Sequence, residues 1–144
     1  MLVRSLLNQK GREVHRCSPD DSVQAALDRL IESRVGSLLV MVGESVEGIV
    51  TERDILRRGL GDVRKLRDQT VGEIMTREVV IATPEDSLQY LMGLMTRNRI
   101  RHVPVFSEGR LEGVVSIGDI IFALLEESAA QNRYLHDYIT GAYR

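Results

Sequence analysis

Two short segments of the chain share a pattern that could hold a phosphate and a sugar. Residues 48–54 read Gly-Ile-Val-Thr-Glu-Arg-Asp, and residues 113–119 read Gly-Val-Val-Ser-Ile-Gly-Asp. A strand ending at the hydroxyl residue would deliver it to a helix N-terminus, where free N–H groups and the positive end of the helix dipole favour a phosphate. The aspartate that follows three residues later, Asp54 or Asp119, could accept both hydroxyls of a ribose diol.

The same residues have a second, purely structural interpretation. Thr51 with Asp54, and Ser116 with Asp119, have the spacing of a capping box that starts a helix. A single motif of this kind usually marks nothing more than a helix start. Here it occurs twice, after equivalent strands that begin with glycine, and a cap does not exclude a ligand contact. We therefore predict that both motifs cap a helix and contact a nucleotide.

These motifs belong to an internal repeat. Shifting the sequence by 65 residues aligns a long stretch without a gap and superimposes Thr51 on Ser116 and Asp54 on Asp119. Upstream, the alignment continues across one length difference, because residues 8–11 (Asn-Gln-Lys-Gly) stand where the second copy has only Thr76. An insertion in a loop between a helix and a strand costs little. The chain is thus predicted to contain two copies of one structural unit.

Each copy is expected to fold in the order β-α-β-β-α. A Pro-Asp-Asp-Ser or Pro-Glu-Asp-Ser segment opens the first helix, and short apolar runs around turn residues indicate a hairpin. The expected strands are residues 13–17, 37–42 and 46–51 in copy one and 79–82, 102–106 and 111–116 in copy two. The second helices are expected at 52–58 and 117–127.

The predicted fold class is therefore α/β (α+β). A unit with three short strands buries little surface by itself, so the copies are expected to pack with pseudo-two-fold symmetry around a cleft. The predicted organisation lists copy one at 1–60, a linker at 61–70, copy two at 71–127 and a helical tail at 128–144. That tail either packs on its own fold or clasps a dimer partner.

With these segments in view, the sequence resembles the tandem cystathionine-β-synthase (CBS) domain family, whose domain pair is also called a Bateman module. The resemblance covers residues 1 to about 127 and rests on residues 18–21, 48–54, 83–86, 101–105 and 113–119. It implies a module that binds AMP, ATP, NAD or S-adenosylmethionine and forms flat homodimers. It also implies adenine contacts from Cys17, Ser18 and Leu38 in copy one and from Ala82, Thr83 and Val103 in copy two.

The two copies depart from each other near the motif. Copy two has Arg101 and His102, which could neutralise a phosphate, where copy one has glycine and serine. Arg97, Arg99 and Arg101 alternate near a helix end, where cations suit the dipole. A solvated face is the simpler interpretation, and phosphate contact by one of them is the alternative. Conversely, Arg53 lies beside Asp54, where copy two has Gly118. We expect unequal affinities at the two sites.

Composition excludes several classes of function. The net charge of −2 gives no general attraction to nucleic acid or to an acidic membrane surface. The single cysteine, Cys17, cannot form a disulfide within the chain, and the histidines lack metal-ligand spacing. No apolar run approaches the ~20 residues that span a bilayer. We therefore expect a cytoplasmic protein with no metal site, no catalytic residues and no catalytic cofactor.

The function predicted from the sequence is that of a non-catalytic regulatory module. It would bind an adenosine-containing nucleotide in the cleft between the copies and signal energy or metabolite state to a regulated protein. The alternative is a structural dimerisation module with no physiological ligand. A homodimer is expected in either case, because Met92 and Met95 are predicted to lie on a helix face that one pair of repeats leaves exposed.

Overall fold

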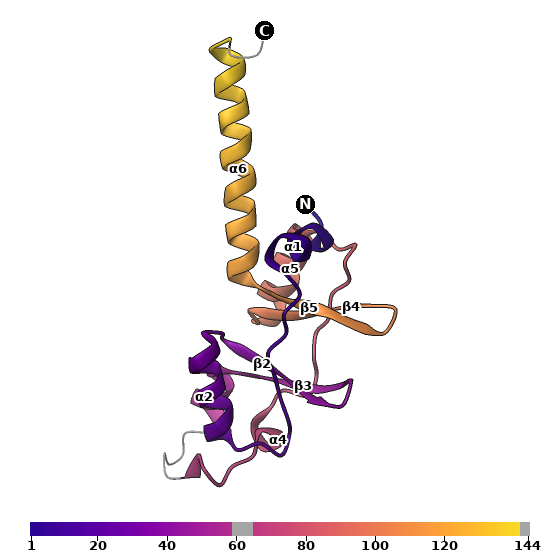
Figure 1. The fold of residues 1–144 in the computed structure, drawn as a ribbon, viewed down its shortest axis with the longest axis vertical. Helices are drawn as coiled ribbons and strands as arrows, with labels where there is room; N and C mark the ends of the chain where they lie inside the picture. The colour runs from indigo at the N-terminus through magenta and orange to yellow at the C-terminus, as the bar shows by residue number, and fades with distance from the viewer. Residues whose placement is uncertain (59–64, 142–144) are drawn as a thin grey trace. The chain divides into compact units, whose positions relative to one another are not determined.

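A computed structural model describes residues 1–58 and 65–141 (Figure 1). It divides into two compact units, one formed by Met1–Arg12 with Ile81–Arg144 and the other by Glu13–Val80. Residues 61–64 of the predicted linker and 142–144 of the predicted tail lie outside the described part. Each unit combines small sheets with helices, so the predicted α+β class is confirmed.

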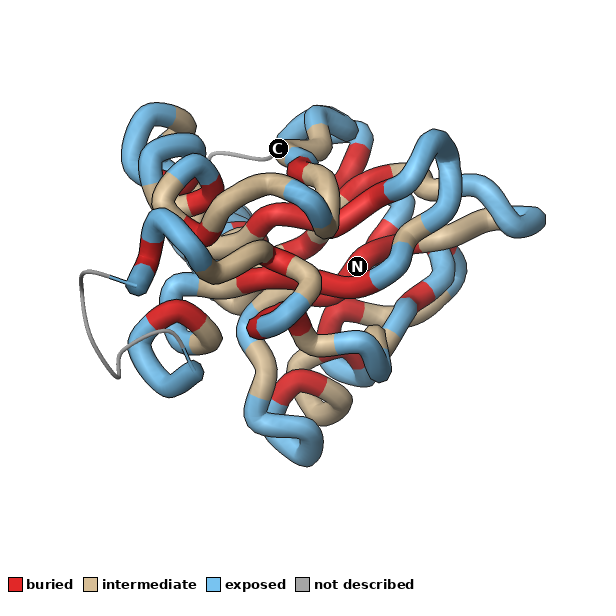
Figure 2. The backbone as a smooth tube through the Cα atoms, turned by 90° about the horizontal axis from the view of Figure 1, so that it is seen from below, coloured by how far each residue is buried: buried red, intermediate tan, exposed pale blue. Residues whose placement is uncertain are grey.

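The Glu13–Val80 unit holds the first copy of the motif. Its three-stranded sheet has the order β1-β2-β3, with β1 parallel to β2 and β2 antiparallel to β3. Buried residues lie on the strands and on one face of each helix, and exposed residues lie along the rest of the backbone (Figure 2). The elements are β1 (Arg16–Cys17), α2 (Val23–Ser33), β2 (Ser37–Val42), β3 (Ser45–Thr51), α3 (Glu52–Arg58) and α4 (Val71–Ile74).

The other unit, called here the 1–12/81–144 unit, holds the second copy of the motif. Its sheet is the antiparallel pair β4-β5, which packs with helices α1 and α5 (Figure 1). A bulge interrupts each hairpin at the same repeat position, between Val40 and Met41 and between Val105 and Phe106. The elements are α1 (Val3–Lys10), α5 (Leu88–Asn98), β4 (His102–Ser107), β5 (Arg110–Ser116) and α6 (Ile117–Ile139).

The first helix of each copy begins and ends in the same way. The Ser22 hydroxyl accepts a hydrogen bond from the N–H of Ala25, and the Ser87 hydroxyl accepts one from the N–H of Tyr90, each at 3.0 Å. These are N-caps of the kind that the Pro-Asp-Ser segments predicted. At the other end, both helices stop at an arginine in the left-handed conformation, Arg34 with φ 55° and Arg99 with φ 54°.

The first strand differs between the copies. In copy one, the N–H of Leu39 donates to the carbonyl of His15 at 3.0 Å, beside strand β1. The residue equivalent to Leu39 is Pro104, which has no N–H to donate. The strand predicted at residues 79–82 is therefore wrong: only Ala82 forms an isolated bridge, to Val105.

The leading segment of each predicted copy packs with the rest of the other copy. Helix α1 starts the copy predicted at 1–60 but lies in the 1–12/81–144 unit, where Val3, Leu6 and Leu7 join the core. Helix α4 starts the copy predicted at 71–127 but lies in the Glu13–Val80 unit, where Val71 and Ile74 join the core. These two helices are equivalent in the repeat alignment, so each unit receives the same kind of segment from a different part of the chain.

Helix α6 is longer than the predicted 117–127 and extends away from strands β4 and β5 (Figure 1). Among the residues whose burial is described, the last buried one of α6 is Ala123, and residues 128–136 are all exposed, so this part of the tail does not pack on its own fold. The prediction for Met92 and Met95 is also wrong, because Met95 is buried and Met92 packs partly against the same core. Among the described residues, no helix is long and apolar enough to cross a membrane.

Candidate functional site

In copy two, strand β5 ends at Ser116 and helix α6 begins at the next residue. The N–H of Ser116 donates to Oδ2 of Asp119 at 2.8 Å, and the N–H of Asp119 donates to Oγ of Ser116 at 3.1 Å. The capping interpretation is therefore correct in structural terms. His102 pairs with Ser116 across the hairpin, and the carbonyl of Arg101 accepts from the N–H of Ile117 at 2.8 Å. The fold thus brings Arg101 and His102 next to the motif.

Asp119 has a second partner that comes from far away in the sequence. The ammonium of Lys10, at the end of α1, donates to Oδ2 of Asp119 at 2.7 Å and to the carbonyl of Val114 at 2.6 Å. The two charged side chains are only 28% and 27% exposed. Burial raises the pKa of Asp119, but hydrogen bonds from Lys10 and Ser116 and the charge of Lys10 outweigh it, so the pKa is lowered overall.

In copy one, the threonine and the aspartate of the motif form more hydrogen bonds with each other. The N–H and the hydroxyl of Thr51 donate to Oδ2 of Asp54 at 3.0 and 3.1 Å, and the N–H of Asp54 donates back to the Thr51 hydroxyl at 3.2 Å. The hydroxyl of Thr76, just after α4, donates to Oδ1 at 3.3 Å. Both carboxylate oxygens of Asp54 therefore have partners. The hydrogen bonds to Asp119 described above, by contrast, all reach Oδ2.

The glycine that opens each motif allows a segment from the other predicted copy to pack closely against the strand: the segment after α4 at Gly48, and helix α1 at Gly113. A Cβ on Gly48 would lie 2.6 Å from the backbone carbonyl oxygen of Thr76, and a Cβ on Gly113 would lie 2.9 Å from Cδ2 of Leu7. Only glycine fits such an approach without a shift of the neighbour. The segment that supplies the extra partner of the aspartate therefore also contacts the strand that leads into the motif.

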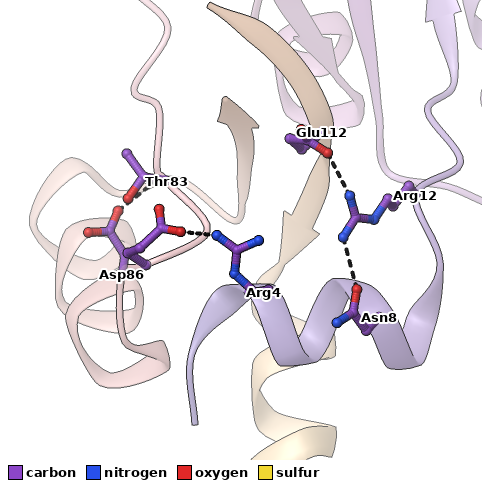
Figure 3. A network of polar contacts seen from close by, with 7 residues as sticks. Arg4, Asn8, Arg12, Thr83, Asp86 and Glu112 are labelled. Carbon is purple, nitrogen blue, oxygen red and sulfur yellow. Dashed lines mark hydrogen bonds and ion pairs between the residues drawn. The ribbon is translucent and has the colours of Figure 1, made fainter. Parts of the chain in front are cut away.

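Polar contacts hold α1 in place beside copy two (Figure 3). The guanidinium of Arg12 donates to Glu112 on β5 at 2.6 Å and to Asn8 at 2.9 Å, and Arg4 pairs with Glu85. Together with the buried apolar face of α1, these contacts fix the end of the helix from which Lys10 extends.

The residues expected to contact adenine lie mainly inside the cores. The side chains of Cys17, Leu38, Ala82 and Val103 are at most 5% exposed. Burial raises the pKa of the Cys17 thiol to about 11, with a further increase from Asp21 and a decrease from Arg29, so this cysteine is an unreactive thiol. An adenine contact at these four residues would have to use backbone atoms.

Ser18 and Thr83 occupy equivalent turns before the first helix of each copy. The N–H of Ser18 donates to Asp21 at 2.9 Å, and the N–H of Thr83 donates to Asp86 at 2.8 Å (Figure 3 shows the second pair). Arg99 forms the left-handed C-cap of α5, and the same role is filled in copy one by Arg34. Arg99 therefore has a structural role, and its prediction as a phosphate contact stays a prediction.

Sequence reasoning missed Lys10 and Thr76 as partners of the two aspartates. A signal existed, because residues 8–11 were recognised as an insertion opposite Thr76. The sequence did not indicate that Lys10 would contact the motif of copy two or that Thr76 would contact the motif of copy one. Arg53 is exposed on the first turn of α3, and nothing beyond its sequence position links it to a ligand.

An open pocket of about 750 Å³ lies within the Glu13–Val80 unit, around α4. Thr76 is on its wall, so it adjoins the partner of Asp54. The charged residues around it are of both signs, namely Asp20, Arg58, Glu73, Arg77 and Glu78. In the described part of the chain, no three or more His, Cys, Asp or Glu side chains gather as a metal site would require.

Comparisons with known proteins agree with this architecture. The chain is 40% identical to the Arabidopsis thaliana protein named CBS domain-containing protein CBSX3, mitochondrial, over 98% of this chain and 73% of that protein. A crystal structure of a CBS-domain-containing protein from Agrobacterium tumefaciens is 38% identical, with a TM-score of 0.82 over 85% of this chain and 98% of that one.

A third structure shares the fold at lower identity. The CBS domain pair of protein MJ0100 is 24% identical, with a TM-score of 0.76 over 88% of this chain and 98% of that chain, and its crystals contained 5′-methylthioadenosine and S-adenosyl-L-methionine. The model of the CBS domain family matches residues 6–61 and again residues 71–126, which is most of the sequence. The two hydroxyl-x-x-Asp motifs fall inside these two matches, and the chain belongs to the CBS domain family as a pair of CBS domains.

Proposed function

We propose that this CBS pair is a non-catalytic regulatory module that binds an adenosine-containing nucleotide at its hydroxyl-x-x-Asp motifs. The observation that carries the proposal is the state of Asp119. Its carboxylate lies at the N-terminus of a long helix, its pKa is lowered, and the hydrogen bonds described above all reach Oδ2. A charged carboxylate has two acceptor oxygens, which suits it to the hydroxyls of a ribose.

The surroundings of Asp119 favour a phosphate nearby. Helix α6 has 23 residues, so its N-terminus carries the full effect of the helix dipole. Gly118 leaves the backbone of the first turn uncovered, because a Cβ there would meet only Oγ of Ser116, at 3.6 Å. His102 begins the neighbouring strand β4 and Arg101 directly precedes it, so both are candidates to contact the same phosphate.

The motif of copy one is proposed as the weaker site. Both oxygens of Asp54 already have partners within the chain. A ribose would have to displace Thr76 or Thr51 to reach the carboxylate. Thr51, Arg53 and Asp54 thus stay in the proposed set of ligand residues, with a lower expected affinity than Ser116 and Asp119.

The ligand class is supported by a protein of the same fold. The MJ0100 pair was crystallised with two adenosine derivatives, 5′-methylthioadenosine and S-adenosyl-L-methionine. Carried over to this chain as a proposal, this favours an adenosyl ligand and leaves AMP, ATP, NAD and S-adenosylmethionine as candidates. Adenine would rest near Ser18 or Thr83, against backbone atoms of the buried strand residues.

A thermal-shift panel of AMP, ADP, ATP, NAD and S-adenosylmethionine tests this function. A ligand present at 100 times its dissociation constant adds about 2.7 kcal/mol to the free energy of unfolding, which is a measurable rise in Tm. We expect at least one compound to raise Tm. If none does, the module is structural and its motifs are helix caps.

We also propose a homodimer, now on different residues from those predicted. Helix α6 exposes Ile121 by 47% and Phe122 and Leu125 by 64% each, close together on successive turns. A second copy of the chain covering this face would remove apolar surface from water. Sedimentation velocity at micromolar concentration should give a dimer, and Phe122→Ser with Leu125→Ser should shift it to a monomer. A monomeric wild-type chain contradicts the proposal.

A further inference from the structure

We propose that Lys10 makes the copy-two site selective for adenosine ligands that carry a phosphate. The ammonium of Lys10 contacts the carboxylate of Asp119, and on ligand binding it would transfer to the phosphate while the ribose hydroxyls bind the carboxylate. This inference rests on the proposed nucleotide function and adds the charge preference of the site and the residue that determines it.

The position of Lys10 carries the first step. Its ammonium contacts two oxygens, the carboxylate of Asp119 at 2.7 Å and the carbonyl of Val114 at 2.6 Å, and both belong to the motif segment of copy two. A lysine ammonium has three donor hydrogens on a flexible stem. It can therefore change partners within a small radius without a change in the backbone.

The base of Lys10 is held still while its head can move. Helix α1 is anchored by the ion pair of Arg12 with Glu112, by the buried side chain of Leu7 and by the contact of Leu7 with Gly113. A fixed helix end that carries a flexible cation keeps the positive charge close to the motif at all times. This charge is supplied by the inserted residues 8–11, which copy two itself does not contain.

The charges of the site lead to selectivity. Asp119 and Lys10 together are neutral. If the ribose of an uncharged adenosine binds the carboxylate of Asp119, the ammonium of Lys10 loses its ion pair and keeps only neutral partners such as the carbonyl of Val114. Binding then costs an ion pair. A phosphorylated ligand replaces that ion pair with a new one between Lys10 and the phosphate. A ligand with a positive charge, such as a sulfonium, meets repulsion instead.

Copy one supplies an internal contrast. The equivalent partner of Asp54 is the neutral hydroxyl of Thr76, at 3.3 Å. A hydroxyl neither compensates a phosphate charge nor repels a cation. The copy-one site is therefore expected to discriminate little between adenosine and AMP.

Calorimetric titration with adenosine and AMP, which differ only in the phosphate, tests the inference. The proteins are the wild-type chain, Lys10→Met and the control Arg110→Met, which removes the same charge from the exposed far end of strand β5 in the same unit. The copy-two site is the one whose binding is weakened in Asp119→Asn. For that site, we expect Lys10→Met to lower the preference for AMP over adenosine at least tenfold. Arg110→Met should keep the wild-type ratio.

The outcomes separate this inference from the proposed function. If the wild-type chain binds neither compound nor any of the panel, both fail. If it binds AMP and Lys10→Met keeps the wild-type ratio, or if Arg110→Met changes the ratio equally, only the role of Lys10 is overturned. Should Lys10→Met not fold, Lys10→Gln serves in its place. Thr76→Lys provides the converse test, because it should raise the AMP preference of the copy-one site, and an unchanged ratio there counts against the proposal.

Discussion

The two motifs share one backbone design and differ in the partner of the aspartate. In both copies the hydroxyl residue and the aspartate cap a helix with nearly the same distances. In copy two the additional partner is a charged ammonium at 2.7 Å, and in copy one it is a neutral hydroxyl at 3.3 Å. A repeated scaffold can therefore hold two sites with different charge preferences, because the segment docked beside each motif comes from elsewhere in the chain.

The largest expected effect concerns the aspartates themselves. Asp119→Asn removes charge-assisted hydrogen bonds worth about 1.5–3 kcal/mol, so nucleotide affinity should fall roughly tenfold to more than a hundredfold. Asp54→Asn should have a smaller effect, because both oxygens of Asp54 already have partners within the chain. Calorimetric titration of both variants measures the difference.

Asparagine retains much of the capping ability of aspartate, which makes this substitution informative. If the motifs were only caps, both variants would bind nucleotide with unchanged affinity. An equal loss of affinity at both sites would instead contradict the proposal that the copy-one site is the weaker one.

The glycines should give the next largest effect and should also differ between copies. In Gly48→Ala the new methyl meets a backbone oxygen of Thr76 at 2.6 Å, which cannot yield cheaply. In Gly113→Ala it meets the flexible end of Leu7 at 2.9 Å. We expect a loss in the free energy of unfolding of about 3 kcal/mol for Gly48→Ala and of about 1 kcal/mol for Gly113→Ala, measured by urea unfolding.

Gly93→Ala is the matched control for these two variants. Gly93 lies within α5, and a Cβ there would meet no atom within 4 Å. Alanine is the better helix former, so this variant should gain about 0.5–1 kcal/mol. Equal losses in Gly48→Ala and Gly113→Ala would show that the two exchanged segments are not docked as described.

The smallest effect is the pH dependence of the Lys10–Asp119 pair. The pKa of Asp119 is lowered in the folded chain, so its contribution to stability is present above the unfolded pKa of about 3.9 and is lost as pH falls through the folded pKa. A double-mutant cycle of Lys10→Met and Asp119→Asn should give a coupling of about 1 kcal/mol near neutral pH. The coupling should vanish in acid; a coupling that persists there would mean that the contact is not an ion pair.

Local patterns predicted much of the fold. Helix α3 begins at the predicted residue, both hairpins fall where turn residues indicated them, and the hydroxyl-x-x-Asp caps form at both positions. Two failures have local causes that the sequence contained. Pro104 removes the donor that would extend the first strand of copy two, and the apolar face of α5 places Met95 inward rather than outward.

From the sequence alone, the chain could be recognised as two copies of one unit, because the identities recur at a constant spacing and each motif acts through neighbours three residues apart. Which segment covers which copy was decided only by the tertiary structure. The apolar faces of α1 and α4 are nearly alike, so local pattern cannot distinguish one partner surface from the other. Packing across more than a hundred residues of sequence brings Lys10 to Asp119, and contacts of that range depend on the whole fold rather than on any segment within it.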